Sequence, residues 1–341
     1  MKKITLPILF LLAFLLHGQQ NFAQTPVEHM DECTASFSNV KRDTWKYLKA
    51  VTQGKKARKI EKTRMGLLNQ YKEEKKKVLK LKSSSLRDAV VKYLDMSYTV
   101  IKEDFDKILD MEDIAEQSYD LMEAYILAKQ KAGDKLDEAF ADYQFAEKDY
   151  AISNNITLIE GDGQKDKVSK KIDKASDALV YYNKIFLIYF KPNKQEAYAL
   201  DALNRGDISS VEQNANSLGG FSDEGFPKLK EVGNYKGYSG LKIVANKFLT
   251  FYKAEAEADF PAIVDFYLKK ETFEKAQKNL NSKSKKSRTQ KDVDEYNAAS
   301  DEYNKAVNIY NEKINAMNSK RTQLFNEWNK TIDHFFKTYS K

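Results

Sequence analysis

The sequence predicts an all-α protein built from long helices. Apolar residues recur every three or four positions, as on one face of a helix, most clearly from Leu86 to Leu109. Residues that interrupt helices are rare, since no proline lies between Val27 and Lys191 and no glycine follows Gly240. No segment alternates apolar and polar residues over the length of a typical strand. These observations together predict the fold class.

The local signals place individual helices. Ser85 is predicted to begin the first clear helix, with Asp88 completing a capping box three residues later. A second helix is predicted from about Glu112 to Asn155. Gly133 lies inside that span, but a single glycine weakens a helix without ending it. The glycines and prolines gathered between Gly206 and Gly240 predict loops.

The first residues predict export. Lys2 and Lys3 precede an apolar run from Ile4 to Leu16, as in a secretory signal peptide covering residues 1–23. This run is about 13 residues long, short of the roughly 20 that a membrane span needs, and no later segment comes closer. We therefore expect a mature chain without a transmembrane span, in the periplasm or at the cell surface.

The cysteine content argues against lipid anchoring. Cys33 is the only cysteine, and the residues before it are not the small ones that a lipoprotein signal requires. In an oxidising compartment it is either a free thiol or a link to a second chain.

An internal repeat predicts the domain plan. Leu86–Met111 aligns without gaps with Leu241–Phe266 at an offset of 155, with seven identities in 26 positions. A second match, of Phe140–Tyr143 with Phe325–Trp328, has an offset of 185. The second unit therefore carries about 30 additional residues between the two matches, and the basic stretch Asn281–Lys291 lies among them.

We accordingly predict two tandem, related antiparallel helical bundles with long coiled-coil-like helices. The first unit is placed at residues 31–160 and the second at 167–341, with an extended helical hairpin at about 270–339.

The last helix carries a seven-residue repeat typical of a coiled-coil seam. One core position is occupied by Tyr296, Tyr303, Tyr310, Met317 and Leu324, and the other by Ser300, Val307, Ile314, Arg321 and Trp328. A helix from about Thr289 to Phe336 would be roughly 70 Å long, which exceeds what a globular core requires. The seam is either a docking or dimerising surface or an internal contact of the bundle.

Charge is uneven along the chain. Residues 54–82 carry a net charge of +9 and residues 103–120 a net charge of −7. The basic residues predicted to bind a polyanion or partner are Lys55, Lys56, Arg58, Lys59, Lys62, Arg64, Lys75, Lys76 and Lys77. The alternative is that the basic and acidic helices are neighbours that offset each other. Sequence-specific binding of nucleic acid is not expected.

The residue types that carry catalysis are scarce. The predicted mature chain has two histidines, His29 and His334, and neither lies in a spacing that places metal ligands on one helical face. There is no phosphate-binding glycine loop and no nucleophile elbow. We therefore predict a protein that is not an enzyme and has no cofactor and no metal.

Three segments carry a resemblance to a known family: Thr44–Arg64, Met111–Leu127 and Leu324–Phe335. They are similar to an uncharacterised family of exported helical proteins common in Bacteroidota, which is labelled after a leptospiral surface protein. The resemblance covers the mature chain. It implies an envelope or surface location and no known activity.

Two functions remain. The leading hypothesis is a helical interaction or scaffold module of the envelope or cell surface, which binds an unknown protein or an envelope polyanion. The alternative is a membrane-active protein whose amphipathic helices open onto lipid, with Ile185–Phe190 as the apolar segment.

Overall fold

The computed structural model describes residues 24–54, 56–104, 118–158 and 167–340. The predicted signal peptide, Lys55 and the predicted junction between the two units lie outside these residues. The elements described below belong to this part of the chain.

The N-terminal elements form one bundle with its own core. They are α1 (Pro26–Thr52), α2 (Ala57–Val78), α3 (Ser85–Thr99), the π-helix η1 (Val100–Asp104) and α5 (Tyr119–Ser153). Leu67, Leu86 and Val90 are fully buried in this core. α5 continues through Gly133, as predicted. Since α1 begins at Pro26, the predicted start of the unit at residue 31 falls inside a helix.

The remaining elements form a second bundle around a larger core. They are α6 (Lys167–Asn204), α7 (Ile208–Glu231), α8 (Gly240–Ala254), the π-helix η2 (Glu255–Asp259), α9 (Phe260–Ser282) and α10 (Gln290–Tyr339). Phe248, Tyr189 and Trp328 form an aromatic contact at the centre of this core. The end of α9 and the start of α10 form an antiparallel hairpin.

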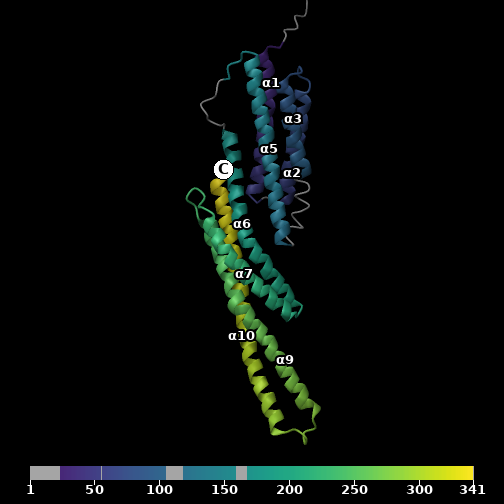
Figure 1. The fold of residues 1–341 in the computed structure, drawn as a ribbon, viewed down its shortest axis with the longest axis vertical. Helices are drawn as coiled ribbons and strands as arrows, with labels where there is room; N and C mark the ends of the chain where they lie inside the picture. The colour runs from purple at the N-terminus through teal and green to yellow at the C-terminus, as the bar shows by residue number, and fades with distance from the viewer. Residues whose placement is uncertain (1–23, 55, 105–117, 159–166, 341) are drawn as a thin grey trace, which may run out of the picture.

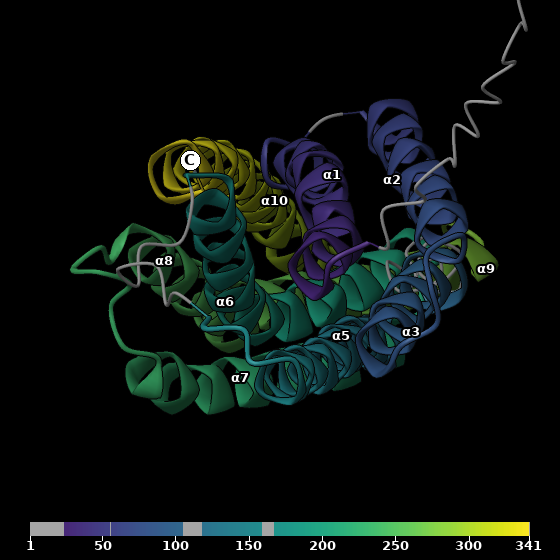
Figure 2. The same ribbon diagram turned by 90° about the horizontal axis from the view of Figure 1, so that it is seen from above.

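The molecule is elongated, and this hairpin extends from one end of it (Figure 1). We call α9, α10 up to about residue 313 and their connecting turn the arm. Seen from above, α6 lies between α8 on one side and α1 and α5 on the other (Figure 2). Met122, Tyr125 and Ile126 of α5 pack against Phe190 of α6, so a small apolar cluster joins the two bundles.

The predicted all-α fold class is confirmed. Within the described residues, the only β-type pairing is an isolated bridge between Tyr235 and Tyr238. Their backbones exchange two hydrogen bonds around a tight turn at Lys236 and Gly237, both with positive φ. No helix of the described part is both long and apolar enough to cross a membrane.

The prediction of loops between Gly206 and Gly240 is wrong for most of that stretch, because α7 runs from Ile208 to Glu231. Its glycines serve close packing. A Cβ on Gly225 would lie 2.8 Å from Leu249 Cδ2, and one on Gly219 would lie 3.3 Å from Ala256 Cβ. Glycine here permits α7 to approach α8 and η2 closely.

The predicted capping box at Ser85 and Asp88 is also wrong, by one residue. Ser84 is the N-cap of α3, and its hydroxyl accepts a hydrogen bond from the Arg87 amide at 3.0 Å. The run of three serines offers several candidate caps, and Ser84 is the one with extended backbone that also reaches His29, at 2.7 Å.

Each bundle has a π-helix after its third α-helix. η1 follows α3 and η2 follows α8, and the bounds of the two pairs differ by 155 residues, the offset of the internal repeat. Pro261 follows η2 closely. Because proline lacks an N–H and crowds the carbonyl four residues earlier, it favours a widened turn before it.

Candidate functional site

The base of the arm contains a buried charged cluster. Arg321 of α10 donates through Nε to Glu196 Oε1 of α6 at 2.6 Å, and through Nη2 to Glu255 Oε1 of η2 at 3.0 Å. Glu196 is 2% exposed and Glu255 is fully buried. One guanidinium therefore joins three elements that are far apart in the sequence.

The two carboxyl groups share a single countercharge. Burial is the main cause that raises the pKa of Glu255 far above its usual value, and the neighbouring Glu196 raises it further. Burial and the neighbouring carboxyl group therefore favour the protonated form of Glu255. Glu255 Oε2 is buried and has no hydrogen-bond partner within the described residues.

The prediction did not identify this cluster. Arg321 occupies a predicted core position of the heptad repeat, and a charged residue at such a position is the sequence signal for the cluster. Glu255 continues the apolar stripe of α8, since it lies three residues after Tyr252 and seven after Phe248, both fully buried. Glu196 lies in a polar segment that gave no signal.

The first bundle also has a buried arginine beside its π-helix, on a different helix of the bundle. Arg64 of α2 is 5% exposed, donates to the backbone carbonyl of Ile101 in η1 at 3.3 Å, and pairs with Glu61 at 2.8 Å. Residue 100, which aligns with Glu255, is Val100 and is buried. The arginine beside η1 therefore binds a backbone carbonyl and a partly exposed carboxyl group of its own helix, whereas the arginine beside η2 binds two buried carboxyl groups.

The predicted seam residues of α10 all face the interior of the chain. Tyr303 stacks on Phe273 with ring centroids 5.1 Å apart, and Tyr310 contacts Phe266 at 4.4 Å. Tyr296 also contacts Phe273. The remaining seam residues, which are buried in the second bundle, are Met317, Leu324 and Trp328. This seam is occupied by contacts within the chain.

The predicted basic residues of the first bundle divide into two groups. Lys56, Arg58, Lys59 and Lys62 are exposed at the start of α2 and form no ion pair within the described residues. Arg64 is buried, Lys75 pairs with Asp95 of α3 at 2.7 Å, and Lys76 and Lys77 pair with acidic residues of their own helix. Most of the acidic segment at residues 103–120 lies outside the described residues.

A second basic region lies at the tip of the arm. Residues 275–291 contain seven basic residues and no acidic one: Lys275, Lys278, Lys283, Lys285, Lys286, Arg288 and Lys291. We call these residues the basic tip. Lys278, Lys285 and Lys286 are exposed and form no ion pair within the described part of the chain.

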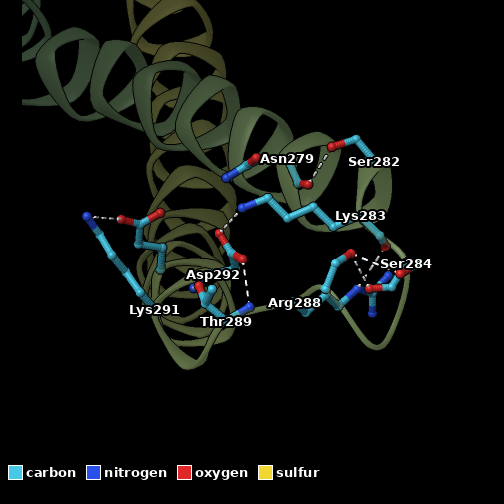
Figure 3. A network of polar contacts seen from close by, with 10 residues as sticks. Asn279, Ser282, Lys283, Ser284, Arg288, Thr289, Lys291 and Asp292 are labelled. Carbon is cyan, nitrogen blue, oxygen red and sulfur yellow. Dashed lines mark hydrogen bonds and ion pairs between the residues drawn. The ribbon is translucent and has the colours of Figure 1, made fainter.

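The turn under the basic tip is held by a polar network (Figure 3). Thr289 and Asp292 form a capping box at the start of α10, and Lys283 pairs with Asp292 at 2.6 Å. The hydrogen bond from Lys283 is the main cause that lowers the pKa of Asp292 to about 2. Arg288 donates to the backbone carbonyl of Lys283 at 3.4 Å. These contacts give the turn a defined conformation.

Cys33 is a free thiol in the core of the first bundle. Its Sγ lies 3.6 Å from His29 Nε2, which also contacts Ser84 Oγ, and Gln24 contacts the other ring nitrogen. This arrangement has the outline of a nucleophile beside a base. However, Cys33 is fully buried, and burial raises the pKa of its thiol to about 11. The thiolate needed for catalysis is therefore disfavoured.

Two further kinds of site, a metal site and a lipid-facing apolar segment, can be checked in the described residues. No group of three or more His, Cys, Asp or Glu side chains there could hold a metal ion. The apolar run Ile185–Phe190 lies in α6, where Ile185 is fully buried and Tyr189 is 4% exposed. This run packs into the cores of the protein.

Comparisons of the chain with protein-family models, curated proteins and solved structures give no match.

Proposed function

We propose that this protein is a non-enzymatic helical interaction module of the bacterial envelope or cell surface, in which the arm presents the binding surface. The observation that carries the proposal is the arm itself. It extends away from both bundles (Figure 1), and α9 alone has 23 residues, or about 35 Å at 1.5 Å per residue. A hairpin of this length adds surface without enlarging the core.

The base of the arm is suited to hold it in a fixed direction. Arg321 ties α10 to α6 and η2 through hydrogen bonds to two buried carboxyl groups. Lys313 of α10 adds an ion pair to Asp259 of η2 at 2.8 Å. Because a buried charge that leaves its partner has no water to replace the lost interaction, the cluster resists sliding of α10 along its neighbours.

The side of the arm offers a partner a groove that is mainly apolar and has charged side chains at its edge. An open groove of about 640 Å³ lies between α9 and α10, where Ala276, Ala298 and Ala299 leave room between the helices. Lys269, Lys275, Glu295 and Glu302 line the groove as well. An apolar strip bordered by charged side chains is typical of protein interfaces.

We also infer that the two bundles are related units, the second of which has gained the arm. The alignment of residues 86–111 with 241–266 supports this. The two π-helices are separated by the same 155 residues as the aligned segments. Export and an envelope or surface location are part of the proposal, supported by the signal-peptide pattern of residues 1–23 and by the resemblance to exported helical proteins.

The arm can be shortened without exposing the core. Replacing residues 275–300 by a short glycine-rich turn keeps the stacked pair of Phe273 and Tyr303, which would then close a shorter hairpin. We expect the shortened protein to keep its helical circular dichroism signal and its cooperative unfolding.

The test compares the intact and shortened proteins for retention of components from isolated envelopes. We expect the intact protein to retain one defined component reproducibly and the shortened protein to lose it. Equal retention by both proteins, or retention by neither, would contradict the proposal.

A further inference from the structure

The basic tip concentrates positive charge at one end of a long molecule. Its seven basic residues lie within 17 consecutive positions without an acidic residue. The turn lies at the far end of the long axis from the first bundle (Figure 1). Charges at the end of a protruding hairpin can approach an external surface before any other part of the protein does.

The positive charge does not extend along the sides of the arm. On α10 the acidic residues Asp294, Glu295 and Glu302 follow the tip, and on α9 Glu271 and Glu274 precede it. Several of these acids pair with lysines of the arm, such as Glu271 with Lys275 at 2.5 Å. A linear polyanion lying along the arm would therefore meet charges of both signs, whereas a flat anionic surface met end-on would meet the basic tip alone.

The turn at residues 281–291 lacks the side chains that insert into lipid or stack on bases. Residues 281–291 contain no apolar or aromatic side chain, and their uncharged members are Asn281, Ser282, Ser284, Ser287, Thr289 and Gln290. Binding through this turn is therefore electrostatic, without penetration of a hydrocarbon layer. Stacking, on which binding of single-stranded nucleic acid depends, is not available.

From these observations we propose that the basic tip binds the phosphate-bearing headgroups of an anionic lipid surface, and that the arm holds the two bundles away from that surface. This inference rests on the proposed function, because it names the partner chemistry of the same arm. The contact is peripheral. It requires the turn to keep its conformation, which the capping box of Thr289 and Asp292 and the ion pair of Lys283 provide.

The test uses three lysines that carry charge but no structural contact. Lys278→Gln, Lys285→Gln and Lys286→Gln remove three charges from exposed positions and break no hydrogen bond within the described residues. A matched control removes the same charge from the first bundle with Lys56→Gln, Arg58→Gln and Lys59→Gln, which are also exposed and unpaired there. Both triple variants have the same net charge, so they separate a local site from general electrostatic attraction.

Binding is measured by co-sedimentation of the purified protein with vesicles. One set contains an anionic phospholipid, and the other contains only zwitterionic phosphatidylcholine. We expect salt-sensitive binding to the anionic vesicles alone. Each lysine near such a surface contributes roughly a five-fold gain in binding, so the tip variant should bind roughly a hundred-fold more weakly and the control should bind nearly as well as the parent.

Equal losses in the two variants would overturn the assignment of the site. Absence of binding by the parent, or retention of a soluble polyphosphate in preference to the vesicles, would overturn the assignment of the ligand. Leakage of the vesicles would also overturn it, because it would indicate penetration. If the parent retains an envelope component through the arm but ignores anionic vesicles, this inference fails while the proposed function stands.

Discussion

The two π-helices occupy equivalent places in the two bundles but have different surroundings. η1 carries Val100 into an apolar core, and Arg64 supplies a hydrogen bond to the backbone carbonyl of Ile101. η2 carries Glu255 into the same place, and Arg321 bridges it to Glu196. The same local distortion of a helix is thus used once to fill a core and once to bring a titratable group into it.

The difference shows where the second bundle buries charged groups, at a cost in folding free energy. Burying two carboxyl groups and a guanidinium is less favourable than burying apolar side chains of similar volume. The cluster lies where α10 leaves the bundle to form the arm. We interpret it as a device that fixes the register and direction of the arm rather than as a source of stability.

Replacing each arginine by methionine is expected to give the largest effect. Arg321→Met removes the hydrogen-bond donor and the shared countercharge of two buried carboxyl groups, so we expect the free energy of unfolding to fall by about 3–5 kcal/mol. Arg64→Met removes the hydrogen bond to the Ile101 carbonyl and the ion pair with Glu61, whose side chain is 44% exposed, and should cost about 1–3 kcal/mol. Urea unfolding of the two variants measures the difference.

The two tryptophans allow each bundle to be followed separately, since Trp45 lies in α1 and Trp328 in α10. A Trp45→Phe background leaves Trp328 as the reporter of the second bundle. Adding Glu196→Leu and Glu255→Leu to Arg321→Met should restore most of the lost stability, because the uncompensated charges are then gone. Equal effects of the two single arginine variants would remove the distinction drawn between η1 and η2.

The buried proton of Glu255 predicts a pH dependence. Its pKa is raised in the folded protein above the ordinary value of 4.5, so folding takes up a proton. Stability from this group is therefore complete below about pH 4.5 and falls as pH rises toward the raised folded pKa. The groups that face Glu255 are Glu196, Asp259 and Arg321.

Glu255→Gln mimics the protonated side chain and should remove this dependence. We expect the variant to be less sensitive to pH than the parent by up to about 1.4 kcal/mol per pH unit between about pH 5 and pH 8. Thermal unfolding of both proteins across that range provides the measurement. Parallel stability curves would show that Glu255 is ionised in the folded protein.

Two glycines of α7 are expected to give smaller changes in stability when replaced by alanine, and the two changes are opposite in sign. Gly225→Ala places a Cβ 2.8 Å from Leu249 Cδ2, so we expect a loss of about 1–3 kcal/mol from overpacking. Gly220→Ala meets no atom within 4 Å and should stabilise the helix by about 0.5–1 kcal/mol. Differential scanning calorimetry of the two variants measures the changes in unfolding temperature. Changes in the same direction would show that α7 does not pack closely on α8.

The sequence predicted the all-α class and the extent of α10 because apolar periodicity and capping are local signals. Thr289, the predicted start of that helix, is its N-cap. It did not predict α7, because glycines that permit close packing look the same as glycines that form loops. The partners of Arg321 could not be predicted either, since Glu196 is separated from it by 125 residues and only the packing of α6 against α10 brings them together.

The central claim is that the arm, and not the basic start of α2, makes the functional contact. Hydrogen–deuterium exchange of the intact protein, free and bound to isolated envelopes, tests this most directly. We predict that binding slows exchange in peptides covering residues 275–300, while peptides covering residues 56–82 stay unchanged. Protection of residues 56–82 with an unchanged arm would contradict the account.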